Sequence, residues 1–135
     1  MVLPRRRSGQ ALDQDTLKLK LNVSLSLLFC VGCFTEMGAD VPAESRYFGE
    51  CDKLAWIHFR NTSGTTEKFV ETFPDEGDTD LFAVMQAIHE VEYEGCVTPD
   101  HHIKVVGNSD WGHRHWAYGL GYIKALIMAV KSQNG

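Results

Sequence analysis

Three side chains that commonly bind metals stand at the ends of three strand-like segments of this 135-residue chain. Cys30 ends one apolar run, His58 lies near the end of the next, and Asp100 follows the third. Thiolate, imidazole and carboxylate groups all ligate divalent metals. Singly, each has an ordinary explanation, as a small buried cysteine, a core histidine or a turn aspartate. Their recurrence at successive strand ends makes a shared metal site a hypothesis, which the pattern alone leaves open.

Further acid–base and anion-binding groups follow the same strand ends. Five of the six histidines lie there or in the last loop, namely His58, His101, His102, His113 and His115. Imidazole can accept or donate a proton near neutral pH. Arg60 and Arg114 could hold a carboxylate through paired hydrogen bonds. Arg114 could equally be a solvated residue at a helix start, and His89 is most simply a surface residue of a helix.

Strands and helices alternate along the sequence that must position these groups. Buried strands are predicted at 23–30, 54–59 and 95–99. A helix is predicted to start after Asp40, with Pro42 in its first turn, and to end at Gly49. Helical spacing of apolar residues predicts further helices over 81–91 and 120–130. The second helix would be capped by Asp78 or Thr79, after a long polar loop over 60–77.

The predicted order of elements is β-α-β-α-β-α. Such an alternation produces a parallel sheet, because each helix returns the chain to the same edge. Ligands of parallel α/β folds bind at the carboxyl ends of the strands. Three βα units can form part of an open sheet or part of a barrel, and a complete (β/α)₈ barrel needs about 250 residues.

Composition and charge exclude several classes of protein. Thirteen basic against eighteen acidic residues give a net charge of −5, which does not favour broad nucleic-acid binding. The sequence has no apolar run long enough to span a membrane, and it lacks the pattern of a signal peptide, so we expect a cytoplasmic protein. Residues 1–20 are polar and are predicted to form an irregular tail.

The cysteines do not form an evident framework. Cys30 and Cys33 are spaced as C-x-x-C, which is typical of a redox pair or half of a zinc site. A second such pair is missing, which disfavours structural zinc. A redox pair usually opens a helix, whereas Cys30 is predicted to close a strand, so redox function is the last of the alternatives.

Four motifs together resemble the C-terminal part of the D-mannonate dehydratase family. They are 29–38 (FCVGCFTEMG), 57–61 (IHFRN), 99–101 (PDH) and 121–126 (GYIKAL), and the linking segment 71–80 is also similar. The resemblance covers roughly residues 24–131 in order. It implies about three C-terminal βα units of a xylose-isomerase-like TIM barrel. It also implies a lyase of hexuronate (glucuronate) catabolism that dehydrates D-mannonate to 2-keto-3-deoxy-D-gluconate with Mn²⁺ or Fe²⁺.

The resemblance also implies roles for individual residues. Cys30, His58 and Asp100 match metal ligands, and His101 matches a catalytic acid–base residue. Arg60 matches an arginine expected on the substrate, and His102 and Arg114 are further candidates for substrate contact. Many members carry a Gly-Tyr pair in the last loop, where this sequence has His113 as the candidate second catalytic residue. Another metal-binding histidine of the family lies on an earlier strand, for which this sequence has no segment.

The expected organisation is therefore an irregular tail over 1–20, which does not resemble the family, and the C-terminal part of a catalytic barrel over 21–135. Such a part would be inactive alone and would need the N-terminal half of the barrel or an oligomeric partner. One alternative is a non-catalytic remnant or a subunit of a split barrel. Another is a sugar isomerase or epimerase on the same barrel.

Overall fold

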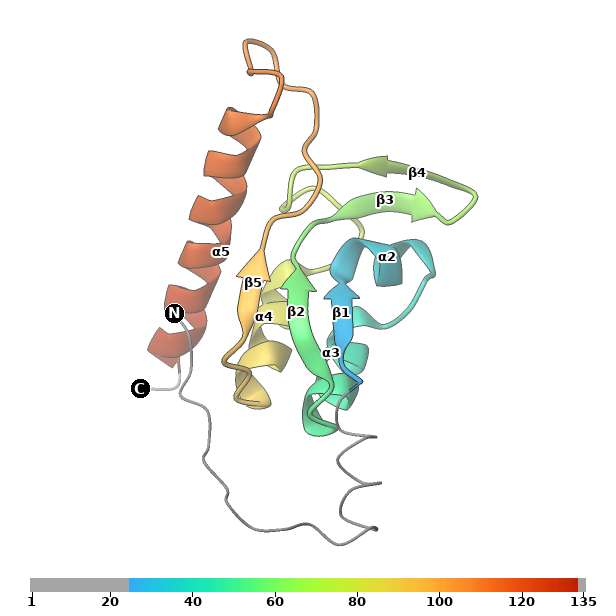
Figure 1. Ribbon diagram of the computed structural model, residues 1–135, viewed down its shortest axis with the longest axis vertical. Coiled ribbons are helices and arrows are strands. Elements are labelled where there is room, and N and C mark those ends of the chain that lie inside the picture. Colours follow the sequence, from blue (N-terminus) through green and yellow to red (C-terminus); the bar gives the residue numbers. More distant parts are fainter. Residues whose placement is uncertain (1–24, 134–135) are drawn as a thin grey trace, which may run out of the picture.

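Strands and helices alternate over residues 25–133, which are the residues that the computed structural model describes (Figure 1). The elements are β1 (Leu27–Cys30), α2 (Val31–Glu36), α3 (Val41–Glu50), β2 (Leu54–His58), β3 (Thr62–Thr65), β4 (Lys68–Glu71), α4 (Leu81–Glu90), β5 (Cys96–Thr98) and α5 (His113–Gln133). The predicted tail and the first residues of the predicted first strand lie outside the described residues.

A parallel sheet of three strands, in the order β1-β2-β5, carries the rest of the fold. Cys30 pairs with His58 and His58 with Thr98, so the three strands end at the same level. The predicted α/β class with parallel strands is thereby confirmed. Within the described residues the sheet remains open, with β1 and β5 as its edges.

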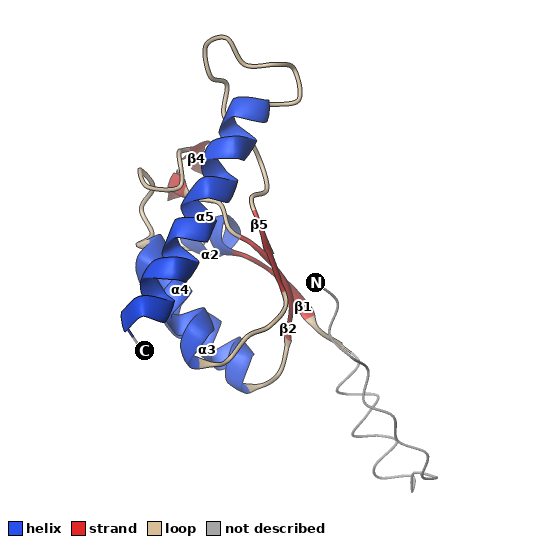
Figure 2. Cartoon of the chain, turned by 90° about the vertical axis from the view of Figure 1, so that its left-hand side faces the viewer, coloured by secondary structure: helices blue, strands red, loops and turns tan. Residues whose placement is uncertain are grey.

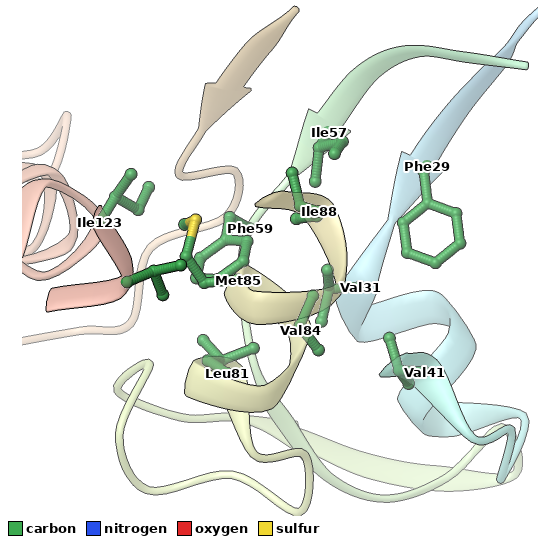
Figure 3. Packing of buried hydrophobic residues seen from close by; sticks show 11 residues of the cluster. Phe29, Val31, Val41, Ile57, Phe59, Leu81, Val84, Met85, Ile88 and Ile123 are labelled. Atoms are coloured by element: carbon green, nitrogen blue, oxygen red, sulfur yellow. The ribbon is translucent and has the colours of Figure 1, made fainter. Parts of the chain in front are cut away.

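Helices cover one face of this sheet, as Figure 2 shows. Side chains alternate between the two faces of a strand, and Phe29 and Ile57 are fully buried on the helix side. They join a core that includes side chains of all the longer helices (Figure 3), namely Val41, Leu81, Val84, Met85, Ile88, Ile123 and Val130. On the opposite face Leu28 and Trp56 are 50% and 44% exposed.

Aspartates start both α3 and α4, the two helices that pack against each other. Asp40 accepts a hydrogen bond from the Ala43 N–H at 3.1 Å, ahead of Pro42 in the first turn of α3. Asp80, rather than the predicted Asp78 or Thr79, caps α4 and accepts from the N–H groups of Phe82 and Ala83. Those two predictions were wrong because the side chains have tertiary partners. Asp78 accepts from Ser63 and Gly64, and Thr79 bonds Thr35.

Gly49 does not end its helix, as the sequence predicted, but lies in its last turn. Helix α3 continues to Glu50, and the left-handed residue that follows is Asp52, with φ 54°. A Cβ atom at position 49 would lie 2.4 Å from the Val91 side chain. The glycine therefore serves the close approach of α3 to the end of α4, a tertiary constraint that a capping rule cannot detect.

The predicted polar loop over 60–77 contains an antiparallel hairpin, formed by β3 and β4. Gly64 has φ 115°, which a residue with a side chain rarely adopts. The hairpin is held to the rest of the chain, since Thr66 N–H donates to the Glu36 carbonyl and Asp78 N–H donates to the Thr62 carbonyl. Its strands were missed because they are short and polar, so they lack alternating hydrophobicity. Helix α2 was missed because it spans only six residues.

Helix α5 begins at His113, earlier than its apolar spacing indicated. Of the predicted stripe, Ile123 and Val130 are buried, whereas Leu120 is exposed. No helix among residues 25–133 combines the length and the apolar character needed to cross a bilayer.

The Asp80 cap gives a direct test of this helix assignment. We expect Asp80→Ala to lower the free energy of unfolding by about 1 kcal/mol, because two N–H groups at the start of α4 lose their acceptor. Urea unfolding of the chain measures the change. Asp80→Ser should retain most of the stability, and Asp110→Ala, at an exposed aspartate between β5 and α5, is the control. Equal losses for Asp80→Ala and Asp110→Ala would contradict the assignment.

Candidate metal centre

The register of the sheet brings three metal-ligating side chains together at one end. Cys30 and His58 are paired residues at the ends of β1 and β2, and Asp100 follows β5 by two residues. One ligand atom from each lies within 4.8 Å of the others. Metal–ligand bonds are about 2.0–2.3 Å long, so donors around one ion can be about 4 Å apart. The spacing is close to what a single cation requires.

The donor set fits a divalent cation chemically. Burial raises the pKa of the Cys30 thiol to about 11, so without a cation the sulfur carries a proton at neutral pH. A coordinating cation displaces that proton. Asp100 contributes charge, and its Oδ2 lies 3.2 Å from His58 Nδ1. Three protein ligands leave coordination positions for a further ligand or a substrate.

A buried guanidinium lies directly beside these donors. Arg60 is 6% exposed, and its Nη1 donates to Glu36 at 2.9 Å and to Glu71 at 3.1 Å. Its Nε lies 3.4 Å from Asp100 Oδ2. One positive charge thus faces three carboxylates, and the excess of two negative charges suits a divalent cation.

Burial opposes the charged form of Arg60, but Cys30, Glu36 and Glu71 outweigh it and raise the pKa of the guanidinium. The neighbouring thiol Cys33 accepts from Nη2 at 3.3 Å. A Cβ atom at position 32 would lie 2.4 Å from Nη1, so Gly32 leaves the space that the guanidinium occupies. These contacts bind Arg60 to protein groups, and a direct contact with substrate remains a prediction.

His101 lies at the edge of this cluster. Its Nδ1 is 2.7 Å from Glu71 Oε1, and its Nε2 is 3.4 Å from Asp100 Oδ2. The side chain is 58% exposed, so the ring is accessible to a ligand.

The other three predicted site residues, His102, His113 and Arg114, have their described contacts among the loop before α5 and the start of that helix, which lie beyond the sheet (Figure 1). The His102 ring packs against Trp116, with ring centroids 6.0 Å apart. His113 bonds Ser109, and Arg114 Nη1 donates to the Val106 carbonyl at 2.9 Å. Their contribution to a site therefore stays a prediction.

Several residues of the cluster were not singled out from the sequence. Glu36 and Glu71 form ion pairs with Arg60. Both were missed even though they lie within segments that carry the family resemblance. The helix criterion used against the C-x-x-C pair was also wrong in part. Cys30 closes β1 and is at the same time the residue that precedes α2, and Cys33 lies within that helix.

The fold and the cluster together define an α/β protein with a candidate metal centre at the carboxyl ends of parallel strands. The model of the family described as "D-mannonate dehydratase (UxuA)" matches residues 1–135. The chain therefore belongs to the D-mannonate dehydratase family. The match includes residues 1–20, which the sequence motifs did not cover.

Individual relatives agree with this assignment. The mannonate dehydratase of Thermotoga maritima is 39% identical over 132 residues, which cover 92% of this chain and 34% of that protein. The mannonate dehydratase of Streptococcus agalactiae serotype V is 31% identical over 135 residues, 95% of this chain and 39% of that protein. The crystal structure of mannonate dehydratase from Streptococcus suis serotype 2 superposes with a TM-score of 0.76 at 26% identity, over 82% of this chain and 34% of that chain. The chain thus spans little more than a third of the length of these relatives.

The three donors can be tested by metal content. We expect the purified chain to bind Mn²⁺, and Cys30→Ala, His58→Ala and Asp100→Ala each to weaken binding, since each removes one of three ligands. Titration calorimetry and elemental analysis measure affinity and stoichiometry. Cys51→Ala, His89→Ala and Asp110→Ala are controls of matched residue type. Unchanged stoichiometry in all three ligand variants would count decisively against the site.

The charge cluster predicts a large stability effect at position 60. Arg60→Met should lower the free energy of unfolding by about 3 kcal/mol, because it leaves partly buried carboxylates without their cation. Arg46→Met breaks the exposed ion pair with Glu90 and should cost less than about 1 kcal/mol. Urea unfolding of both variants measures the two losses. Equal losses of unfolding free energy would show that the charge of Arg60 does not stabilise the cluster more than an exposed ion pair does.

Proposed function

We propose that this chain is the C-terminal part of a (β/α)₈-barrel lyase that dehydrates D-mannonate to 2-keto-3-deoxy-D-gluconate. The observation that carries the proposal is the convergence of Cys30, His58 and Asp100 at the carboxyl ends of neighbouring strands. In barrel enzymes, active sites lie at this end of the strands. The family to which the chain belongs supplies the substrate class.

The open face of the sheet supports the barrel. Leu28, Trp56 and Cys96 form a paired row across β1, β2 and β5 on the face that no helix of residues 25–133 covers. Trp56 Nε1 also donates to Thr98 Oγ1 at 2.8 Å on this face. Inward side chains of a barrel pack in layers against those of other strands. The N-terminal half of a barrel, or a partner chain, would cover this row.

The proposed chemistry removes water across C2 and C3 of the sugar acid. His101 takes the proton from C2 while the C2–H electrons form a double bond to C3. An acid, proposed here as His113, protonates the C3 hydroxyl, which departs as water. The resulting enol becomes the 2-keto group of the product when its C2 hydroxyl loses a proton and C3 gains one.

A divalent cation, Mn²⁺ or Fe²⁺, would be held by Cys30, His58 and Asp100. When bound, it would supply Lewis acidity that stabilises negative charge developing next to the substrate carboxylate. Substrate binding is proposed to involve Arg60, His102 and Arg114. Arg60 also orients the carboxylates of Glu71 and Asp100, with which it forms ion pairs.

This chain spans only 34–39% of the length of these relatives. A non-catalytic remnant or a subunit of a split barrel is therefore the alternative function. An isomerase or epimerase would use the same end of a barrel on a different sugar. An isomerase or epimerase would release a different product from the lyase, and a non-catalytic remnant would release none.

An activity assay separates these possibilities. The chain alone, supplied with Mn²⁺ or Fe²⁺, should form little or no 2-keto-3-deoxy-D-gluconate, because part of the barrel is missing. The chain should be co-expressed with the N-terminal part of the Thermotoga maritima relative that lies outside the match. The pair should then form 2-keto-3-deoxy-D-gluconate, and Asp100→Ala in this chain should abolish that activity. Robust turnover by the monomeric chain contradicts the fragment. Failure of the complemented pair on D-mannonate, with conversion of another hexuronate or a ketose, favours the isomerase.

A further inference from the structure

A carboxylate from the hairpin holds the ring of the proposed base. We propose that Glu71 is a positioning residue that fixes His101 with the proton on Nδ1 and leaves Nε2 to face the metal centre. The inference rests on the proposed function for the role of His101. Its geometric basis is the 2.7 Å contact between Glu71 Oε1 and His101 Nδ1.

Glu71 can impose an orientation because it is itself held. Both of its carboxylate oxygens accept from Arg60 Nη1, at 3.1 and 3.3 Å. Arg60 is buried and is fixed in turn by Glu36. The hairpin that carries Glu71 bonds to the end of α2 through Thr66 N–H. The orientation of the ring is therefore linked to the buried charge, although the ring itself is exposed.

An ionised carboxylate can only accept hydrogen bonds. A neutral His101 that bonds Glu71 must consequently carry its proton on Nδ1. The lone pair then lies on Nε2, which is the ring atom 3.4 Å from Asp100 Oδ2. This is the nitrogen that can take a proton from a substrate bound next to the metal donors.

Nitrogen-15 NMR of the histidine rings in the chain tests the proposal directly. The measurement is made at about pH 9, where imidazoles are neutral, and His101→Asn identifies the signals of this ring. We expect His101 to be mainly the Nδ1–H tautomer, whereas free histidine prefers Nε2–H. A wild-type ring in the Nε2–H form overturns the proposal, whatever the variants do.

Variants then assign the effect to Glu71. Glu71→Met, which cannot accept a hydrogen bond, should shift His101 toward Nε2–H, and Glu71→Gln, which keeps an acceptor oxygen, should restore Nδ1–H in part. Glu67→Met, at the exposed turn of the same hairpin, should leave the ring unchanged. Equal spectra for Glu71→Met and the wild type contradict the proposal.

The complemented lyase supplies a second measurement. There Glu71→Met should lower kcat by about 10- to 100-fold with little change in KM, because it disorients a base without removing a substrate contact. If the ring responds to Glu71 but D-mannonate is not dehydrated, the proposed function fails and the positioning of His101 stands. If dehydration occurs but the ring ignores Glu71, only the positioning role fails.

Discussion

The parallel register of β1, β2 and β5 is the constraint on which the candidate site depends. Because Cys30, His58 and Thr98 are paired across the sheet, the chain leaves the three strands at one level. Residues separated by 28 and 42 positions in sequence then place their donor atoms within 4.8 Å. A shift of one residue in any strand would turn its side chain to the helix-covered face. The hydrophobic core, which requires Phe29 and Ile57 on that face, therefore also determines where the ligands point.

Buried charge organises the neighbourhood of these donors. Arg60 joins Glu36 of α2, Glu71 of β4 and Asp100 after β5, so a single guanidinium links three segments that are distant in sequence. Such a cluster is stable only if every charge has a partner, since an unpaired buried charge costs several kcal/mol. Glu71 and Asp100 of this cluster also contact His101, and the three carboxylates place negative charge beside the candidate metal donors. Structural and proposed catalytic roles are thus properties of one network.

The open face of the sheet relates the chain to its longer relatives. Among residues 25–133, strands β1 and β5 present unpaired edges, and Leu28 and Trp56 are exposed. Apolar side chains at such a position ordinarily pack against further elements, and exposed edges favour association. The candidate metal donors Cys30 and His58 belong to this same face by the alternation of the strands. Any element that packs on this open face would therefore also lie next to the candidate metal donors.

The sequence by itself determined the local features. The sequence located β1, β2 and β5, the Asp40–Pro42 start signal located α3, helical spacing located α4 and α5, and the residue types at strand ends identified the candidate donors. Tertiary structure decided whatever depends on contacts between distant segments. Examples are the polar β3–β4 hairpin, the place of Gly49 against Val91, and the partners of Asp78. The role of Glu71 belongs here too, because a glutamate in a polar segment looks solvated until folding brings it to Arg60 and His101. Periodicity records only which face of its own element a residue occupies, whereas ion pairs and close packing depend on the neighbouring element that folding supplies.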